Sequence, residues 1–273
     1  MNIGDMGVPF IYQGEELIYP EYVKDGLVLH YDFSGMTNND ASKDIARDLS
    51  GNGNHGTLQN FNFTPESGYD KNKLLSDGTD DVVRTTTNET LNIVGDLTVE
   101  ITIECKETTS DWRWFVGNSQ NSSHLTGFSL YQQPVYPHGL AFGYRGTLLK
   151  DSNYTVEEGK KYHLLGTSED GLLKFYINGQ LIISRQAVAE SDNSFRDLSF
   201  MRATYYASPH FKGGVGSTRI YNKALTTEEV AHNYAIEKER FGIGKEIVEE
   251  PKLNSLPISQ AAIGKTLKVG GDK

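Results

Sequence analysis

The sequence predicts an all-β protein in which antiparallel strands pack as a sandwich. Short segments of alternating apolar and polar residues recur along most of the chain, which is the pattern of strands with one buried face. Glycine, tyrosine and phenylalanine are abundant, with 28, 15 and 12 residues, as in proteins whose many short strands are joined by turns. Consecutive strand signals are not separated by helices, which excludes parallel βαβ units.

The strand signals follow one another at short intervals. Residues 97–105 alternate strictly between apolar and polar side chains, which predicts a strand. The clearest hairpin joins residues 172–177 to 180–184, because Asn178-Gly179 strongly favours a type I′ turn. Further strands are predicted at residues 27–33, 114–116, 127–131, 140–144, 162–168, 200–203 and 214–221.

One helix and two extended ends complete the predicted organisation. Thr226 and Glu229 have the spacing of a capping box, and Gly242 is suited to end the helix that begins there. Sandwiches as large as this chain of 273 residues commonly form one domain. We therefore expect an N-terminal arm at 1–25, one domain at 26–242 and an extended C-terminal tail at 243–273.

Both ends carry apolar residues that a free segment would expose. The arm contains a hairpin candidate, PFIYQGEELIYP, with its turn at Gln13-Gly14. The tail combines scattered apolar residues with two prolines and shows no helical period. Segments of this kind gain order by docking on partners. We expect both ends to be poorly ordered in an isolated monomer and ordered in an assembly.

Composition excludes several classes of partner. The net charge of −10 argues against nucleic acid, which needs clustered Lys and Arg, and against electrostatic docking on an anionic membrane. Cys105 is the only cysteine, so an internal disulfide and a cysteine-based zinc cluster are excluded. The N-terminus lacks the pattern of a secretory signal peptide, and no apolar stretch has the length of a transmembrane segment.

Five segments in a fixed order resemble a known family. They read GLVLHYDFS from Gly26, DLSGNGNHGTLQNF from Asp48, DGTDDVV from Asp77, FYINGQLI from Phe175 and STRIYNKALTTEEV from Ser217. Together they resemble the laminin-G-like jelly rolls of the concanavalin A-like superfamily, over residues 26–234. The resemblance implies a jelly-roll β-sandwich whose first strand lies beside residues 218–221. It also implies a domain that binds or holds a partner and is not an enzyme.

Calcium is the candidate cofactor. Asp48 and Asn52 lie in one glycine-broken loop and Asp80 lies in an acidic turn, and such loops present the oxygen ligands that Ca²⁺ prefers. The resemblance permits a structural calcium ion in loops of this kind. The alternative is turn chemistry alone, since turns favour Asp, Asn and Gly without any metal. This chain also has Gly216 and Ser217 where the family often has an acidic residue.

A second candidate is the pair Glu100 and Glu104 in the segment EITIE. It resembles the strand that carries the catalytic carboxylates of β-glucanases with this fold, in which a retaining mechanism needs two carboxyl groups close together. Thr102 stands where those enzymes have a central aspartate. We therefore favour a solvated strand face over catalysis at this position.

A glycan-binding face is the third candidate. Sugars stack their C–H faces on aromatic rings while fixed polar groups read their hydroxyls. Aromatic residues and an arginine in or beside predicted loops could form such a face, and the alternative is that they pack the core or brace loops. The candidate residues are Trp112, Tyr136, Tyr144, Arg145, Tyr205 and Tyr206.

These features favour a non-catalytic structural protein of a bacteriophage virion, either a head decoration or a tail or baseplate component. Single laminin-G-like domains with short arms resemble such accessory proteins, which assemble in the host cytoplasm. Its partners would be other virion proteins, reached through the arm and tail in an oligomeric assembly, and host-surface glycans. A bacterial carbohydrate-binding module is the main alternative, and a β-glucanase-type glycoside hydrolase is the third.

Overall fold

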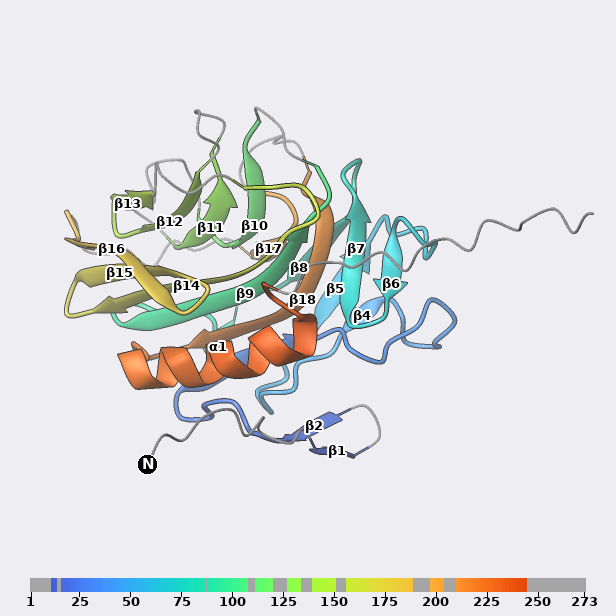
Figure 1. Cartoon of the computed structure of the whole chain (residues 1–273), viewed down its shortest axis with the longest axis horizontal. Helices are drawn as coiled ribbons and strands as arrows, with labels where there is room; N and C mark the ends of the chain where they lie inside the picture. Colours follow the sequence, from blue (N-terminus) through green and yellow to red (C-terminus); the bar gives the residue numbers. More distant parts are fainter. Residues whose placement is uncertain are drawn as a thin grey trace, which may run out of the picture.

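The protein is a sandwich of two antiparallel β-sheets with one helix packed on the outside (Figure 1). The computed structural model describes residues 11–13, 16–86, 88–107, 111–119, 127–133, 139–150, 156–188, 197–203 and 210–244. This architecture confirms the predicted all-β, concanavalin A-like jelly roll with a single C-terminal helix.

The two sheets are named here after their central strands. The β9 sheet contains, in spatial order, β16 (Gln180–Gln186), β15 (Leu172–Ile177), β14 (Lys161–Glu169), β9 (Leu97–Cys105), β18 (Lys212–Tyr221), β7 (Lys73–Asp77) and β6 (Gly68–Asp70), with β3 (Leu27–Asp32) also paired to β18. The β10 sheet contains β13 (Thr147–Lys150), β12 (Leu140–Tyr144), β11 (Ser129–Gln132), β10 (Arg113–Gly117), β17 (Leu198–Phe200), β8 (Val82–Thr85), β5 (Gly56–Gln59) and β4 (Ile45–Ala46).

The pairing of the first and last strands of the sandwich confirms a prediction from the sequence. β3 and β18 are antiparallel, with Tyr31 opposite Thr218 and Leu29 opposite Ile220. Leu29 and Ile220 are both buried in the core between the sheets. The hairpin of β15 and β16 also forms at Asn178-Gly179, where both residues have positive φ, as a type I′ turn requires.

Five strands were not predicted, namely β4, β5, β6, β7 and β13, whereas β8 follows the acidic turn as expected. Each of the five has two to five residues. A strand this short shows too few alternations to be separated from a loop by its pattern. These segments are defined as strands by their pairing with neighbours. For example, β7 is paired on one side with β6 and on the other with β18.

Helix α1 (Thr227–Phe241) begins and ends at the predicted residues. The Thr226 side chain accepts a hydrogen bond from the Glu229 amide, and the Glu229 side chain accepts one from the Thr226 amide, which is a complete capping box. Gly242 ends the helix in the left-handed conformation, with φ of 64°. Figure 1 shows α1 lying along the outer face of the β9 sheet.

The outer face of β9 corrects the predicted solvated strand face. Every residue of β9 is buried. Val99, Ile101 and Ile103 belong to the core between the sheets. On the opposite face, Glu100 and Thr102 lie beneath α1, since Glu100 is bonded to Asn233 and Thr102 to Glu237 of the helix. The alternation was predicted correctly, but the polar face meets a helix where solvent was expected.

A buried ion pair network joins α1 to the sheet. Arg219 on β18 lies between two carboxylates, binding Glu100 of β9 through Nε and Glu237 of α1 through a terminal nitrogen at 2.9 Å. His163 Nε2 lies 2.9 Å from the other oxygen of Glu100. Burial alone would raise the pKa of both glutamates, but Arg219 and the neighbouring positive charges and hydrogen bonds together outweigh burial and lower each pKa to about 2. Both therefore remain charged in the folded protein.

The N-terminal segment is anchored to the same network through Tyr22. The Arg219 guanidinium lies 3.6 Å from the centre of the Tyr22 ring, in a cation–π arrangement. The Tyr22 hydroxyl donates to Glu237 at 2.7 Å and accepts from Arg240 at 2.6 Å. Tyr22, which belongs to the predicted N-terminal arm, therefore packs against the buried network of the sandwich.

The predicted hairpin of the arm also forms. β1 (Ile11–Gln13) and β2 (Glu16–Tyr19) pair antiparallel. Within the part of the chain that the structure describes, they make a two-stranded sheet of their own, and Figure 1 shows it beside the sandwich.

We predict that Arg219→Met strongly lowers the free energy of unfolding. The substitution leaves Glu100 and Glu237 buried without a cation, and breaking such a network costs about 3–5 kcal/mol. Urea unfolding at pH 7 measures the change. Arg185→Met is the matched control, since Arg185 is exposed on edge strand β16, and the expected change there is within about 0.5 kcal/mol.

Low pH should reduce the difference in the free energy of unfolding between the wild type and Arg219→Met. The pKa of Glu100 and Glu237 is lowered from 4.5 to about 2 by folding, so their contribution is present above pH 4.5 and is lost as the pH falls towards 2. In the variant, both carboxyl groups can be buried in the neutral form at low pH. An Arg219→Met variant as stable as the Arg185→Met control at pH 7 would contradict this account.

Candidate functional site

A polar pocket lies where three loops meet. Its volume is about 550 Å³, within the range of about 300–1,000 Å³ that is usual for small-molecule sites. One wall comes from the loop between β4 and β5, a second from the loop between β8 and β9, and a third from the residue after β18. The lining residues are Val28, Asn52, Glu89, Thr90, Asn92, Ile93, Val94, Asp96 and Asn222.

The first wall is held against β3 by Asp48. One carboxylate oxygen of Asp48 accepts from the backbone amides of His30 and Ser50, both at 2.9 Å. The other oxygen accepts from the Ser50 hydroxyl at 2.8 Å and from the Asn54 amide at 2.9 Å. These four bonds close the loop around one buried carboxylate. Asp48 therefore acts as a brace.

Asn54 connects the first wall of the pocket to the second wall. Its side chain is buried, and its amide nitrogen donates to the Val28 carbonyl at 2.7 Å. Its amide oxygen accepts from Asn88 at 2.6 Å and from the Thr90 hydroxyl at 3.1 Å. The loop of residues 48–54 and the loop of residues 88–96 are thus joined by side-chain hydrogen bonds.

The second wall is also fixed from the core. Tyr144 of β12 is fully buried and donates its hydroxyl hydrogen bond to the Gly95 carbonyl at 3.1 Å. Asp96 accepts the Asp170 backbone amide through Oδ1 at 2.9 Å. Both contacts are made by the two residues that follow Val94, whose side chain is 50% exposed. The pocket therefore has preformed walls carrying an exposed aliphatic side chain beside polar groups.

The lining groups fit a polyhydroxylated ligand. The carboxylates of Glu89 and Asp96 and three asparagine amides can exchange hydrogen bonds with hydroxyl groups. The aliphatic side chains, above all Val94, can contact the C–H face of a sugar ring. Among the described residues, the ionisable groups that line the pocket are the carboxylates of Glu89 and Asp96.

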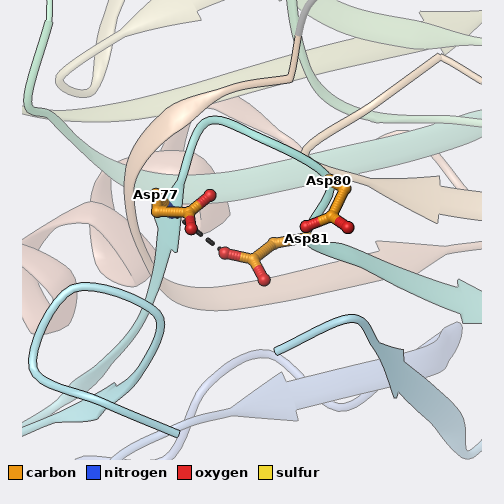
Figure 2. A group of neighbouring side chains, drawn as sticks. All are labelled: Asp77, Asp80 and Asp81. Carbon is orange, nitrogen blue, oxygen red and sulfur yellow. Dashed lines mark hydrogen bonds between the residues drawn. The ribbon is translucent and has the colours of Figure 1, made fainter. Parts of the chain in front are cut away.

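Three acidic residues form a separate cluster in the turn after β7 (Figure 2). Carboxylate oxygens of Asp77, Asp80 and Asp81 all lie within 4.8 Å of one another. Asp81 accepts from the Asp77 amide at 2.9 Å and from the Ser67 hydroxyl at 2.9 Å. Burial raises the pKa of Asp81 to about 6, and Asp77 and Asp80 add to the rise. A bound cation would relieve this repulsion.

The predicted calcium ligands do not come together as one site. Asp80 lies in the acidic turn, whereas both oxygens of Asp48 are occupied by its own loop. The Asn52 amide nitrogen donates to the carbonyls of Leu27 and Val28. Asx chemistry and calcium chemistry use the same residue types, so the sequence could not separate a brace from a ligand. Among the described residues, Asp77, Asp80 and Asp81 are the group of carboxylates that could hold a cation.

The predicted glycan-binding residues are scattered. Trp112 is half-buried and its ring lies 5.4 Å from that of Tyr131, which stacks on Trp114 at 4.7 Å. Tyr144, the last residue of β12, is fully buried in the core, and Arg145, in the turn that follows, is 5% exposed, so neither presents an open face to a sugar in this conformation. Tyr136, Tyr205 and Tyr206 lie outside the described residues.

The carboxylates of EITIE do not form an open catalytic pair. Glu100 is fully buried and engaged by Arg219 and His163. Glu104 is 5% exposed and pairs with Lys73 and Lys106. Four residues along one strand separate the two backbones by about 13 Å. Neither group is available to a substrate in this arrangement.

Comparison with known protein families decides the classification. A family described as the concanavalin A-like lectin/glucanases superfamily matches residues 77–231, which is more than half of the chain. The chain belongs to this superfamily. No curated protein matches it. Among the described residues, α1 is too short and too polar to cross a membrane.

Solved structures share the fold at low identity. The Trypanosoma rangeli sialidase has a TM-score of 0.58 at 15% identity, with 79% of this chain and 34% of the sialidase covered. Domain 4 of an extracellular GH43 arabinanase from Geobacillus stearothermophilus, in complex with arabinotriose, has a TM-score of 0.52 at 20% identity, covering 77% of this chain and 98% of that domain. The binding domain of Paraclostridial Mosquitocidal Protein 1 has a TM-score of 0.57 at 17% identity, with 77% of this chain and 52% of that chain covered. This chain spans about a third of the sialidase.

We predict that calcium raises the melting temperature through the acidic turn. A cation that binds only the folded state stabilises it by mass action, so chelation with EDTA should lower the melting temperature of the wild type. Asp81→Asn should melt at the same temperature with and without calcium. Asp44→Asn alters an exposed carboxylate outside the cluster and should respond like the wild type. Identical wild-type melting curves in calcium and EDTA would exclude the ion.

Proposed function

We propose that this protein is a non-catalytic carbohydrate-binding domain. The observation that carries the proposal is the preformed pocket between the loops, with exposed Val94 beside amide and carboxylate groups. Lectin-type recognition needs this combination, because sugar rings have apolar C–H faces and polar edges. Membership of the lectin/glucanases superfamily supports the proposal, as does an arabinanase domain of the same fold in complex with arabinotriose.

The absence of catalysis is part of the proposal. The two glutamates that resemble glucanase carboxylates are buried and paired with cations. The pocket offers Glu89 and Asp96, but Asp96 already accepts a backbone hydrogen bond at its Oδ1 atom. In this proposal both carboxylates of the pocket accept hydrogen bonds from ligand hydroxyl groups and take no part in proton transfer.

We predict that glycan binding depends on the exposed face of Val94. Binding of the full chain to an array of oligosaccharides identifies a ligand, and titration calorimetry then compares variants. Val94→Ala should weaken binding by about tenfold, because apolar contact area with the sugar is lost. Val188→Ala makes the same change at a side chain that is 74% exposed and lies outside the pocket, and it should leave the affinity unchanged. Equal affinities of the two variants would remove the pocket as the site.

We further propose that the domain is displayed on a bacteriophage virion and attached through its N-terminal hairpin. The two-stranded sheet of β1 and β2 pairs only with itself among the described residues, and an isolated hairpin of this size is marginal in water. Packing against a neighbouring subunit would stabilise it. Oligomerisation and the neighbouring virion proteins belong to this proposal.

Removal of residues 1–19 tests the attachment. The truncated protein keeps Tyr22 and its bonds to Glu237 and Arg240, so its melting temperature should stay close to that of the full chain. Its incorporation into particles, measured by mass spectrometry of purified virions, should be lost. Tyr22→Ala is the contrasting variant, which should lower stability while leaving the hairpin present. Normal incorporation of the truncated protein would leave only the free carbohydrate-binding domain.

A further inference from the structure

The charged groups of the pocket all have one sign. Glu89 and Asp96 are the ionisable residues among those that line it, and no Lys, Arg or His is among them. The whole chain is also acidic, with a net charge of −10. A ligand that brings a carboxylate, sulfate or phosphate group would meet the negative charges of Glu89 and Asp96, with no cation in the lining to offset them.

The fixed polar groups of the pocket are hydrogen-bond acceptors. Both donor positions of the Asn52 amide are taken up by the carbonyls of Leu27 and Val28 and by Ser50, which leaves its oxygen as the group still to be satisfied. Asp96 uses Oδ1 for the Asp170 amide, so Oδ2 remains for a ligand. These two residues therefore present fixed acceptors to whatever enters.

The other polar groups of the pocket do not reverse its preference for ligands that donate hydrogen bonds. The Thr90 hydroxyl is already bonded to Asn54 and Asn88. Glu89 is exposed and can only accept hydrogen bonds when ionised. Asn92 and Asn222 are exposed amides that can turn either way. A ligand rich in hydrogen-bond donors is complementary to this set, and a ligand rich in acceptors is not.

We propose that the pocket selects the uncharged or amino-bearing end of a saccharide and rejects acidic sugars. This inference rests on the carbohydrate-binding function proposed above and adds the class of sugar. Vicinal hydroxyl groups, or a hydroxyl and an ammonium group, donate to Asp96 and Asn52. The C–H face of the ring lies against Val94. The carboxylate of Glu89 is the second negative charge in the lining of the pocket.

Three saccharides that differ in one group provide the test. Oligosaccharides ending in glucose, glucosamine or glucuronic acid share the pyranose ring and differ in charge. Titration calorimetry of the full chain should show the glucuronic acid end binding at least tenfold more weakly than the neutral end. The glucosamine end should bind as well as the neutral one or better. Added salt should narrow these differences, because screening weakens the interaction between charges.

The double variant Asp96→Asn with Glu89→Gln tests the cause. It keeps side-chain shape and the Asp170 contact, and it should reduce the discrimination against glucuronic acid to less than threefold. Glu66→Gln alters an exposed carboxylate outside the pocket and should keep the full discrimination. Matching melting curves for all variants establish that each one is folded.

The outcomes separate this inference from the function on which it rests. Binding of the neutral and acidic ends with equal affinity by the wild type overturns the charge selectivity and leaves carbohydrate binding in place. Discrimination that persists in the double variant assigns the selectivity to other residues and also overturns the inference. Failure of the wild type to bind any saccharide on the array or in the titrations overturns both.

Discussion

The burial of Arg219 between two carboxylates is the constraint on which the rest of the structure depends. Its partners lie on different elements, Glu100 on β9 and Glu237 on α1. An uncompensated charge in such a place is strongly destabilising, so the register of β9 against β18 and the position of the helix are coupled. Tyr22 extends the coupling to the N-terminal segment by lying against the guanidinium. The paired charges thus hold α1 against β9 and β18 in this position.

The same strand links this network to the pocket. Tyr221, at the end of β18, donates its hydroxyl hydrogen bond to Glu100 at 3.2 Å and accepts one from Asn233 of α1 at 3.0 Å. The next residue, Asn222, lines the pocket, and its backbone amide donates to the Gly26 carbonyl at 2.9 Å. The helix covers the face on which the glucanase-like carboxylates lie, so that face cannot hold a substrate. The proposed function accordingly places binding at the loops, where the strands end.

Prediction from the sequence succeeded where one physical signal dominated. Alternation revealed β9 and β14, and capping chemistry located α1, because those patterns are local. It failed at Glu100, since a buried charge and a solvated charge have the same period and only the helix, 130 positions away in the chain, distinguishes them. The pocket was missed for a similar reason. Its walls come from three separated segments of ordinary turn residues, and no spacing along the chain marks their meeting. Asp48 was predicted as a calcium ligand and Tyr144 as a glycan contact. In the structure, each supports a wall of the pocket through a hydrogen bond to the backbone.

The bracing has a consequence for recognition. Ordering a free side chain on binding costs about 0.5–1.5 kcal/mol, and this cost differs among the lining residues. Asn52 and Asp96 are already held by hydrogen bonds to the backbone. A ligand that donates to their free oxygens therefore does not incur this ordering cost. Glu89, Asn92 and Asn222 are exposed and must be ordered by the ligand. Discrimination between sugars should therefore come mainly from the two fixed acceptors. Under the proposed function, the three exposed groups would contribute less to the choice among ligands.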